Sequence, residues 1–368
     1  MPCVRKETKL LGPALVSILK KSTVAFEGLT AVKSDWEMCL GLIQPYILNG
    51  IDTLYSRTFM NKEAIKKALS VVENVTLAYN DLFDEAPWID DITMTKAKEK
   101  LSAMKYVVGL DSSSAALSKM NKFYDNLALS EADTFYDAYS KVRQWAKEMH
   151  QTMDVNDYVQ NVAPNAVYQR DLNTVKLLAG MLQLPVFDAS FPLSVLYGKF
   201  GSIVGHEISH GFDLEGSLYS KDGQPGNWWT NDSRIDFLDQ ANCLMQQYSD
   251  MSSNLTNDIY TPGFSINDDI ADNAGIKAAF KGFQMAKQTE VRLPGLLQFS
   301  SDQLFFISYA SFYCSKYRPG HTLYTHSPGK LRVQGPLRNF DSFAKTFNCA
   351  TGTFYNPSRS DNNKCSPW

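Results

Sequence analysis

The sequence predicts a mainly α protein of the α+β class, with a helical first part and a second part that adds a few short strands. Over the first about 150 residues, apolar side chains recur at helical spacing in one segment after another. Near residue 155, short β-branched and aromatic runs bounded by proline and glycine begin. The length of 368 residues fits two lobes at the usual size of about 100–200 residues per domain.

Each expected element follows from a local pattern. Helices are expected over 64–83, over 91–104 after a Pro-Trp turn, and over 131–150, where aromatic residues recur every three to four positions. Short strands are expected over 165–168 and 174–178. A helical pattern resumes over about 193–212, and a loop rich in Gly and Asp follows it. Further helices are expected from Asp232, from about Asp268, from Ser301 and over 337–347.

Composition excludes several kinds of partner. The formal net charge of −3 provides no field that would gather phosphates, so nucleic acid is not expected as a partner. The longest apolar run, residues 10–19, is much shorter than the about 20 residues that a bilayer span needs, so no membrane span is expected in this chain. Lys20 and Lys21 follow that run directly, which favours an amphipathic helix over a signal peptide.

Cysteines and sequons indicate the compartment. The 6 cysteines include no Cys-x-x-Cys pair, which favours structural disulfides over a thiolate zinc site. Sequons for N-glycosylation stand at Asn74, Asn231 and Asn254. Together they favour an extracellular location, either secreted or as the ectodomain of a cell-surface protein whose anchor is not in this chain.

The segment His206-Glu-Ile-Ser-His210 is the strongest chemical signal. Two histidines four positions apart on a helix project from one face, so their imidazoles can hold one Zn²⁺ while Glu207 acts as a general base. A catalytic zinc also needs a third protein ligand and an open position for water.

The acidic segment Asp268-Asp-Ile-Ala-Asp272 offers that third ligand. Asp268 and Asp272 share a helix face, so one can bind the metal while the other accepts a hydrogen bond from a ligating imidazole. Asp213, three residues after His210, can orient that histidine in the same way. The alternative is an acidic helix start that is favoured only by the helix dipole.

These motifs, with others in the same order, make the chain resemble the neprilysin family of zinc endopeptidases. The matching stretches run through nearly the whole chain: Ala86-Pro-Trp-Ile89, Asn165-Ala-Val-Tyr168, the segment 205–213, Lys221-Asp-Gly223 with Trp228-Trp229, the segment 268–275, Tyr317-Arg-Pro319, the segment 326–332 and Cys365-Ser-Pro-Trp368.

The resemblance implies a thermolysin-like zinc-peptidase lobe over residues 151–368 and a helical lobe over 1–150 that partly covers the active site. It implies roles for ten residues: zinc ligands His206, His210 and Asp268; catalytic Glu207 and, for the oxyanion, His326; Asp272 and Asp213 as partners of the two histidines; and Asn165, Ala166 and Arg332 as contacts of the substrate. It also implies a disulfide between Cys243 and Cys365.

The chain departs from the family pattern in several places. Asp268 stands where the family has Glu, so the carboxylate is one methylene shorter; a small helix shift and weaker zinc binding are expected, and Asp268→Glu is expected to tighten binding. Val167 stands for an aromatic residue, and Lys176-Leu-Leu178 replaces a Phe-Pro-containing stretch. Family ectodomains are about twice as long, and the family partners of Cys39, Cys314 and Cys349 are missing.

The resemblance therefore implies a zinc-dependent endopeptidase that binds one Zn²⁺ per chain and hydrolyses small peptides. Two alternatives remain. The first is a catalytically silent peptide-binding relative, which Asp268 favours. The second is an incomplete part of a larger enzyme of this type. Substrate preference and oligomeric state stay open.

Overall fold

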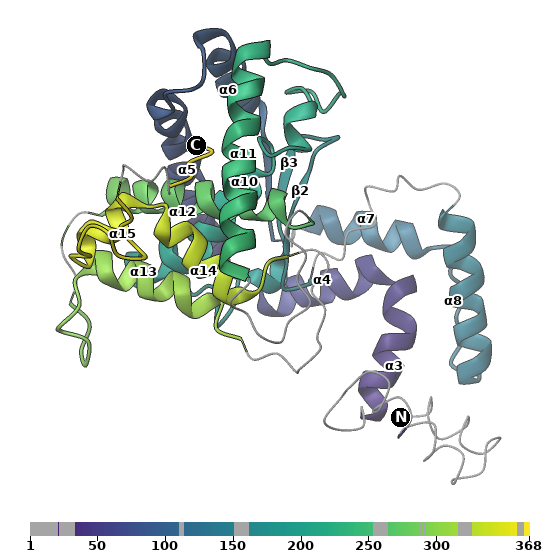
Figure 1. Cartoon of the computed structure of the whole chain (residues 1–368). Coiled ribbons are helices and arrows are strands. Elements are labelled where there is room, and N and C mark those ends of the chain that lie inside the picture. Colours follow the sequence, from purple (N-terminus) through teal and green to yellow (C-terminus); the bar gives the residue numbers. More distant parts are fainter. Residues whose placement is uncertain are drawn as a thin grey trace. The chain divides into compact units, whose positions relative to one another are not determined.

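The computed structural model describes Lys21, Thr289 and the residues 34–109, 114–150, 162–252, 264–287, 292–315, 326–358 and 364–368. It is mostly helical with one small sheet (Figure 1), which confirms the predicted fold class. The expected helix over 10–19, the sequon at Asn254 and the motif Tyr317-Arg-Pro319 lie outside the described residues. Among the helices of the described ranges, none has both the length and the apolarity to cross a bilayer.

The chain forms two compact units, each made of two separate segments. Unit 1 comprises Met1–Met60 and Leu110–Val162, and unit 2 comprises Asn61–Gly109 and Ala163–Trp368. The helices of residues 61–109 therefore pack with the C-terminal part of the chain. The division into lobes 1–150 and 151–368, with the first partly covering a site, stays a prediction.

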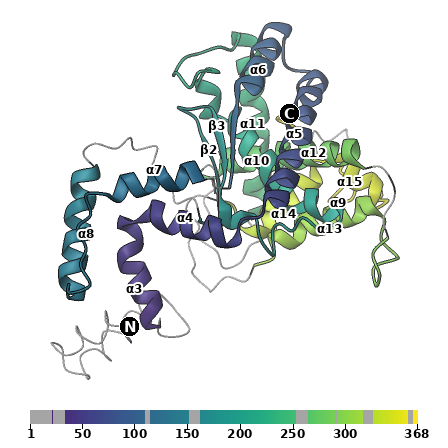
Figure 2. The ribbon, with the colours of Figure 1, turned by 180° about the vertical axis from the view of Figure 1, so that it is seen from behind.

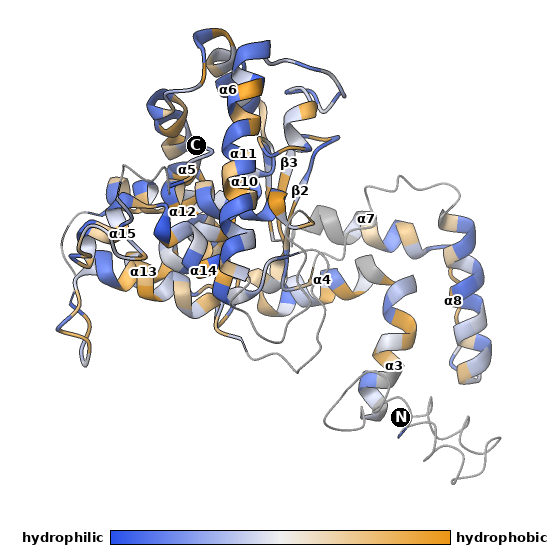
Figure 3. Cartoon of the chain, in the orientation of Figure 1, coloured by the Kyte–Doolittle hydropathy of each residue, from blue (hydrophilic) through white to orange (hydrophobic). Residues whose placement is uncertain are grey.

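Unit 1 is helical in its described part. Its helices are α3 (Asp35–Ile43), α4 (Leu48–Phe59), α7 (Ser114–Tyr124) and α8 (Phe135–His150). Tyr124 joins three of these elements: its hydroxyl accepts the backbone N–H of Gly50, and its ring stacks on Trp145 with centroids 4.9 Å apart. Figure 3 shows mainly hydrophilic residues along the visible side of α8, and Trp145 and Val142 lie on its buried face.

Unit 2 contains the helices and strands that were predicted for the second half of the chain, together with two long helices from the first half. Its elements are α5 (Lys62–Glu85), α6 (Asp91–Ala103), β1 (Lys105–Val108), β2 (Ala166–Gln169), β3 (Thr174–Leu177), α9 (Leu193–Leu196), α10 (Ser202–Ser209), α11 (Asn231–Ser252), α12 (Ile266–Ala286), α13 (Ser301–Phe312), α14 (Gly329–Arg338) and α15 (Asp341–Thr346). Helix α12 lies at the centre of the unit, and most of the residues from Asp269 to Phe283 are buried.

The sheet has the order β1-β3-β2, with β1 parallel and β2 antiparallel to β3. Strands β2 and β3 lie side by side in both views (Figures 1 and 2). The turn between them contains Asn173, whose φ of 47° is in the left-handed region that asparagine tolerates. Its side-chain amide donates to the carbonyls of Lys100 and Lys221, so the turn is tied to α6 and to the loop after α10.

Within the described residues, the predicted elements except the last helix are confirmed with shifted boundaries. The helix expected over 131–150 begins at Phe135, because Asp133 and Asp137 accept backbone N–H groups of the preceding turn. The pattern over 193–212 is divided into α9, a π-helical turn at Tyr197–Gly201 and α10. The single helix expected over 337–347 is wrong as one element, because α14 ends at Arg338 and α15 begins at Asp341.

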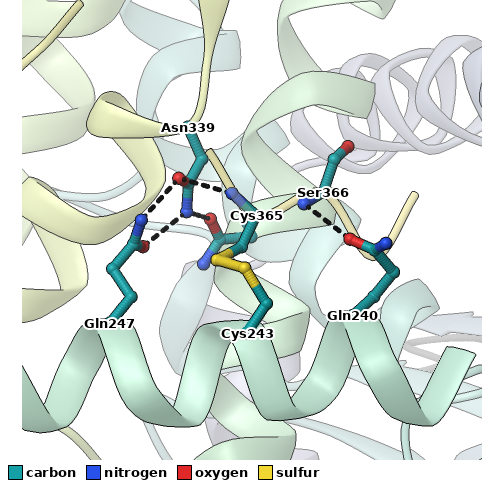
Figure 4. The surroundings of a disulfide bond; sticks show 7 residues. Gln240, Cys243, Gln247, Asn339, Cys365 and Ser366 are labelled. Carbon is teal, nitrogen blue, oxygen red and sulfur yellow. Dashed lines mark hydrogen bonds between the residues drawn. A yellow bond between two sulfur atoms is a disulfide. The ribbon is translucent and has the colours of Figure 1, made fainter. Parts of the chain in front are cut away.

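A disulfide joins Cys243 of α11 to Cys365, 122 residues later, as the family resemblance implied. Figure 4 shows the amide of Asn339 beside it, which pairs with the amide of Gln247 through two hydrogen bonds and accepts the N–H of Cys365. The C-terminal segment is thus fixed to α11 by one covalent and several polar contacts. Cys314 and Cys349 are free thiols.

Candidate metal centre

Helix α10 and the residue that follows it bring both histidines of the motif to one point. His206 and Glu207 lie on α10 and are each 6% exposed. His210 caps the helix and donates its N–H to the carbonyl of His206. The two imidazoles meet edge to face, and their Nε2 atoms lie 3.0 Å apart.

Asp268, in the first turn of α12, completes the cluster. Its Oδ1 atom lies 3.5 Å from Nε2 of His206 and 4.0 Å from Nε2 of His210. The point equidistant from these three atoms lies about 2 Å from each, which is the length of a Zn–N or Zn–O bond. Within the described ranges these three residues form the group whose ligand atoms are close enough to share a metal ion.

The hydrogen bonds of the two imidazoles also suit a bound cation. Nδ1 of His206 lies 2.8 Å from Asp272 Oδ1, and Nδ1 of His210 lies 2.7 Å from Asp213 Oδ2. A carboxylate accepts a hydrogen bond from a protonated Nδ1, so in a neutral imidazole held this way the lone pair is on Nε2. The two Nε2 atoms, 3.0 Å apart, can share a proton or a bound cation, and two imidazole nitrogens with a carboxylate are a donor set that fits Zn²⁺.

Asp272 is the most strongly held group behind the cluster. Arg332 of α14 donates to both of its oxygens, at 2.7 and 2.8 Å, and the hydroxyl of Tyr313 donates to Oδ1 at 3.2 Å. Burial alone would raise the pKa of Asp272, but the Arg332 guanidinium and His206 outweigh it and hold that pKa far below its usual range. Burial lowers the pKa of His206, whereas Asp272 and Asp268 raise it to about 10. The surroundings therefore favour a positive charge at the cluster.

Asp213 supports the second histidine from a short loop. One of its oxygens binds His210, and the other accepts the backbone N–H groups of Glu215 and Gly216 at 2.9 and 2.6 Å. Its exposed fraction is 3%. The carboxylate is therefore fixed by the backbone of its own loop.

A cavity of about 730 Å³ opens beside the cluster. Its lining includes nine of the ten residues predicted for the site, namely Asn165, Ala166, His206, Glu207, His210, Asp213, Asp268, His326 and Arg332. The tenth, Asp272, is buried behind His206. The side chain of His326 is 52% exposed, and its Nε2 lies 3.2 Å from Asp268 Oδ1. The structure thus brings all ten residues together, while their roles stay predictions.

Sequence reasoning missed several residues that shape this region. Apolar side chains of Met181, Val186, Ile203 and Phe312 line one part of the cavity, and no local motif marks them. The buried carboxylate of Asp269 accepts the hydroxyls of Ser265 and Ser327, and so ties α12 to the residue next to His326. Burial raises the pKa of Asp269 to about 8. These roles depend on contacts between distant segments, so the sequence pattern carries no signal for them.

A helix with the His-Glu-x-x-His motif, next to a second helix that supplies a carboxylate, is the arrangement of the zinc metallopeptidase class. The chain belongs to peptidase family M13: the model of that family matches residues 165–363, and a second model with the same description matches residues 4–111. The resemblance to the neprilysin family is confirmed.

Relatives of the same family match this chain over most of its length. Neprilysin-11 of Caenorhabditis elegans is 31% identical over 90% of the chain, human membrane metallo-endopeptidase-like 1 is 32% identical over 90%, and mouse neprilysin is 30% identical over 94%. The matched region covers 40%, 44% and 47% of these proteins, so the chain spans less than half of their length.

Solved structures of other proteins have the same fold as this chain. A zinc metalloprotease of Mycobacterium tuberculosis, in complex with an inhibitor, superposes with a TM-score of 0.76 at 24% identity. The match covers 96% of this chain and 54% of that protein. A galactose-containing glycoprotein complex of Haemonchus also gives a TM-score of 0.76 at 24% identity, over 91% of this chain and 55% of that one.

Proposed function

We propose that this chain is a zinc-dependent endopeptidase that hydrolyses small peptides, with one Zn²⁺ held by His206, His210 and Asp268. The observation that supports it most directly is the convergence of three ligand atoms, within 4.8 Å of one another, beside a cavity of about 730 Å³. When bound there, zinc would polarise the scissile carbonyl and lower the pKa of the attacking water.

The surrounding side chains would carry out the proton transfers. Glu207 follows His206 on α10 and lines the cavity, which supports a role in which its carboxylate would take a proton from the attacking water and deliver it to the leaving amine. His326 would donate a hydrogen bond to the oxyanion of the tetrahedral intermediate. Asp272 and Asp213 would keep each imidazole in the tautomer whose Nε2 faces the metal.

The outer edge of strand β2 would bind the peptide backbone of the substrate. The carbonyl of Asn165 accepts the N–H of Leu178 from the β3 side. Since successive residues of an antiparallel strand alternate, the N–H and C=O of Ala166 point to the opposite edge of β2. Ala166 also lines the cavity. An extended peptide can therefore add to β2 as a further strand.

Arg332 would have two roles, one toward Asp272 and one toward the substrate. Two of its nitrogens donate to Asp272, and it also lines the cavity. We propose that it orients Asp272 and presents its remaining N–H groups to a substrate carbonyl. The disulfide and the sequon at the exposed Asn231 support an extracellular location. Asn74 suits a glycan less well, because its amide donates to the hydroxyl of Tyr197.

Metal analysis and a peptidase assay together test the proposal. The parent protein should contain one zinc per chain and cleave an internally quenched peptide, and a chelator should abolish cleavage. His206→Ala should lose the metal and the activity, whereas Lys98→Ala, in a solvent-exposed ion pair with Asp84, should keep both. Zinc binding without cleavage would favour the silent peptide-binding alternative, and a parent chain that binds no zinc would contradict the proposal.

A further inference from the structure

A buried lysine contacts the loop that follows the zinc-binding motif. Lys100 lies in the last turn of α6 and is 1% exposed. Its Nζ donates to the backbone carbonyls of Gly211, Gly216 and Tyr219, each at 2.7 Å. An ammonium group has three N–H donors, so these three acceptors satisfy it completely.

All three carbonyls belong to residues 211–219, the segment that begins directly after His210. The same segment contains Asp213, which binds His210 through one oxygen and the N–H groups of Glu215 and Gly216 through the other. The backbone of this loop therefore lies between two opposite charges, with carbonyls directed to Lys100 and amides directed to Asp213. Gly216 takes part in both sets of contacts: its N–H donates to Asp213, and its carbonyl accepts a hydrogen bond from Lys100.

The surroundings of Lys100 and Gly216 are closely packed. A Cβ atom on Gly216 would collide with the carbonyl oxygen of His210. The rings of Tyr168, Phe212 and Trp228 surround the ammonium group at 5.6 to 6.0 Å from their centroids. Lys100 contacts the backbone on both sides of Asp213, at Gly211 and at Gly216.

Burial of the charged lysine side chain costs free energy. Burial lowers the pKa of Lys100 to about 7, although the charge of Asp213 acts in the opposite direction. An apolar side chain would fill the same space among aromatic rings without that cost, but it would remove the donor to the carbonyls of Gly211, Gly216 and Tyr219. A buried amine with three carbonyl partners is therefore better explained by what it holds in place than by its contribution to the core.

We infer that Lys100 is a positioning residue of the metal centre: it fixes the segment 211–219, and through Asp213 it fixes the imidazole of His210. This inference rests on the proposed function for its link to zinc. The contact between Lys100 and the loop does not, because it consists of direct hydrogen bonds from Lys100 to three backbone carbonyls.

Lys100→Met is the direct test, because methionine has a similar length and no donor. Lys98→Met is the matched control, since Lys98 lies on the same helix in a solvent-exposed ion pair with Asp84. In the metal-free full chain, hydrogen exchange at the amides of Glu215 and Gly216 should become about tenfold faster or more in Lys100→Met. Zinc affinity, measured by competition with a chelator, should fall by about 10- to 100-fold, as for other groups that orient a ligand. Lys98→Met should change neither.

Two further measurements separate positioning from a purely structural role. If Lys100 acts through Asp213, the losses of zinc affinity in Lys100→Met and Asp213→Asn should be clearly less than additive in the double variant. If Lys100→Met does not fold, Lys100→Gln, which keeps two donors, should show smaller changes in the same directions. A lower melting temperature with zinc affinity within twofold of the parent, or unchanged exchange at Glu215 and Gly216, would overturn the inference. A parent that binds no zinc would refute the proposed function, while the exchange data would still decide whether Lys100 holds the loop.

Discussion

Gly205 of α10 and Gly275 of α12 lie directly against each other. A Cβ atom on Gly275 would lie 2.6 Å from the backbone nitrogen of His206, and one on Gly205 would collide with the carbonyl of Gly275. The two helices therefore approach more closely than side chains would permit. This approach brings Asp268 and Asp272 of α12 within reach of His206.

Gly275→Ala should force the two helices apart. Overpacking of this kind typically costs about 1–3 kcal/mol, and here it should also separate Asp272 from His206. We expect a lower melting temperature together with weaker zinc binding. Gly226→Ala is a suitable control, because nothing lies within 4 Å of a Cβ at that position. Unchanged zinc affinity in Gly275→Ala would show that the close approach is not needed for the cluster.

Glu207→Gln should keep zinc and lose peptidase activity. The amide preserves the size of the side chain but cannot accept the proton, and general base catalysis is typically worth about 10²–10⁴-fold in rate. Glu215→Gln makes the same change in the lining of the same cavity, and it should leave kcat almost unchanged. Equal kcat values for Glu207→Gln and the parent on a short peptide would rule out Glu207 as the base.

Asp268→Glu should weaken zinc binding. Sequence comparison alone favours the opposite result, but Oδ1 of Asp268 already lies at the cluster, so an extra methylene should crowd the metal. Asp268→Ala should lose more affinity than the about 10- to 100-fold typical of an outer partner. Chelator competition on the three proteins side by side distinguishes these cases. If the Ala variant binds zinc as tightly as the parent, Asp268 is not a ligand.

Arg332→Met should destabilise the fold through Asp272. Removal of one partner from a buried ion pair typically costs about 3–5 kcal/mol, because the other charge stays buried. Arg332 lowers the folded-state pKa of Asp272, so the stability that this carboxylate contributes is present above its unfolded pKa, near 4, and is lost as the pH falls through the folded value.

The loss should consequently be large at pH 7 and smaller at pH 3, where Asp272 in the variant is protonated. Urea unfolding of the metal-free proteins at both pH values measures it. Lys330→Met, at an exposed position of α14, should cost little at either pH. A loss of the same size at pH 3 and pH 7 would show that the effect does not arise from Asp272.

Replacing Cys243 and Cys365 by serine should lower the free energy of unfolding by about 2–5 kcal/mol, as expected for a disulfide that closes a long loop. The crosslink spans 122 residues, so its loss should mainly stabilise the unfolded chain. Cys314→Ser, which removes an exposed free thiol, serves as the control. If the denaturant unfolding curve of the variant without Cys243 and Cys365 coincides with that of Cys314→Ser, this expectation is contradicted.

The sequence predicts the long helices well because their apolar periodicity is a local property. Residues 64–83 and 91–104 fall almost wholly within α5 and α6. Strand β1 was not predicted: it has 4 residues, follows α6 after one residue, and forms only because β3, about 70 residues later, pairs with it. Its pattern carries no turn signal that would separate it from the helix.

The same distinction applies to the site. His206, Glu207 and His210 are close in the chain, so their spacing alone indicates metal chemistry. His326 and Arg332 became candidates only through the family resemblance. Lys100 and Tyr313 were not candidates at all, because their importance depends on segments more than 40 residues away: Lys100 contacts the carbonyl of Gly211, and Tyr313 contacts Asp272 of α12.

The outward-facing N–H and C=O of Ala166 would have a consequence for which peptides the proposed peptidase could cleave. A backbone that pairs with this edge must offer its own N–H at that position, and proline has none. Peptides with proline or an N-methylated residue at that position should therefore bind poorly, whatever their side chains. Stable helices should resist cleavage as well, since their backbone groups are already engaged with one another. Selection of substrates would then depend first on whether a stretch of chain can become extended, and only second on its sequence.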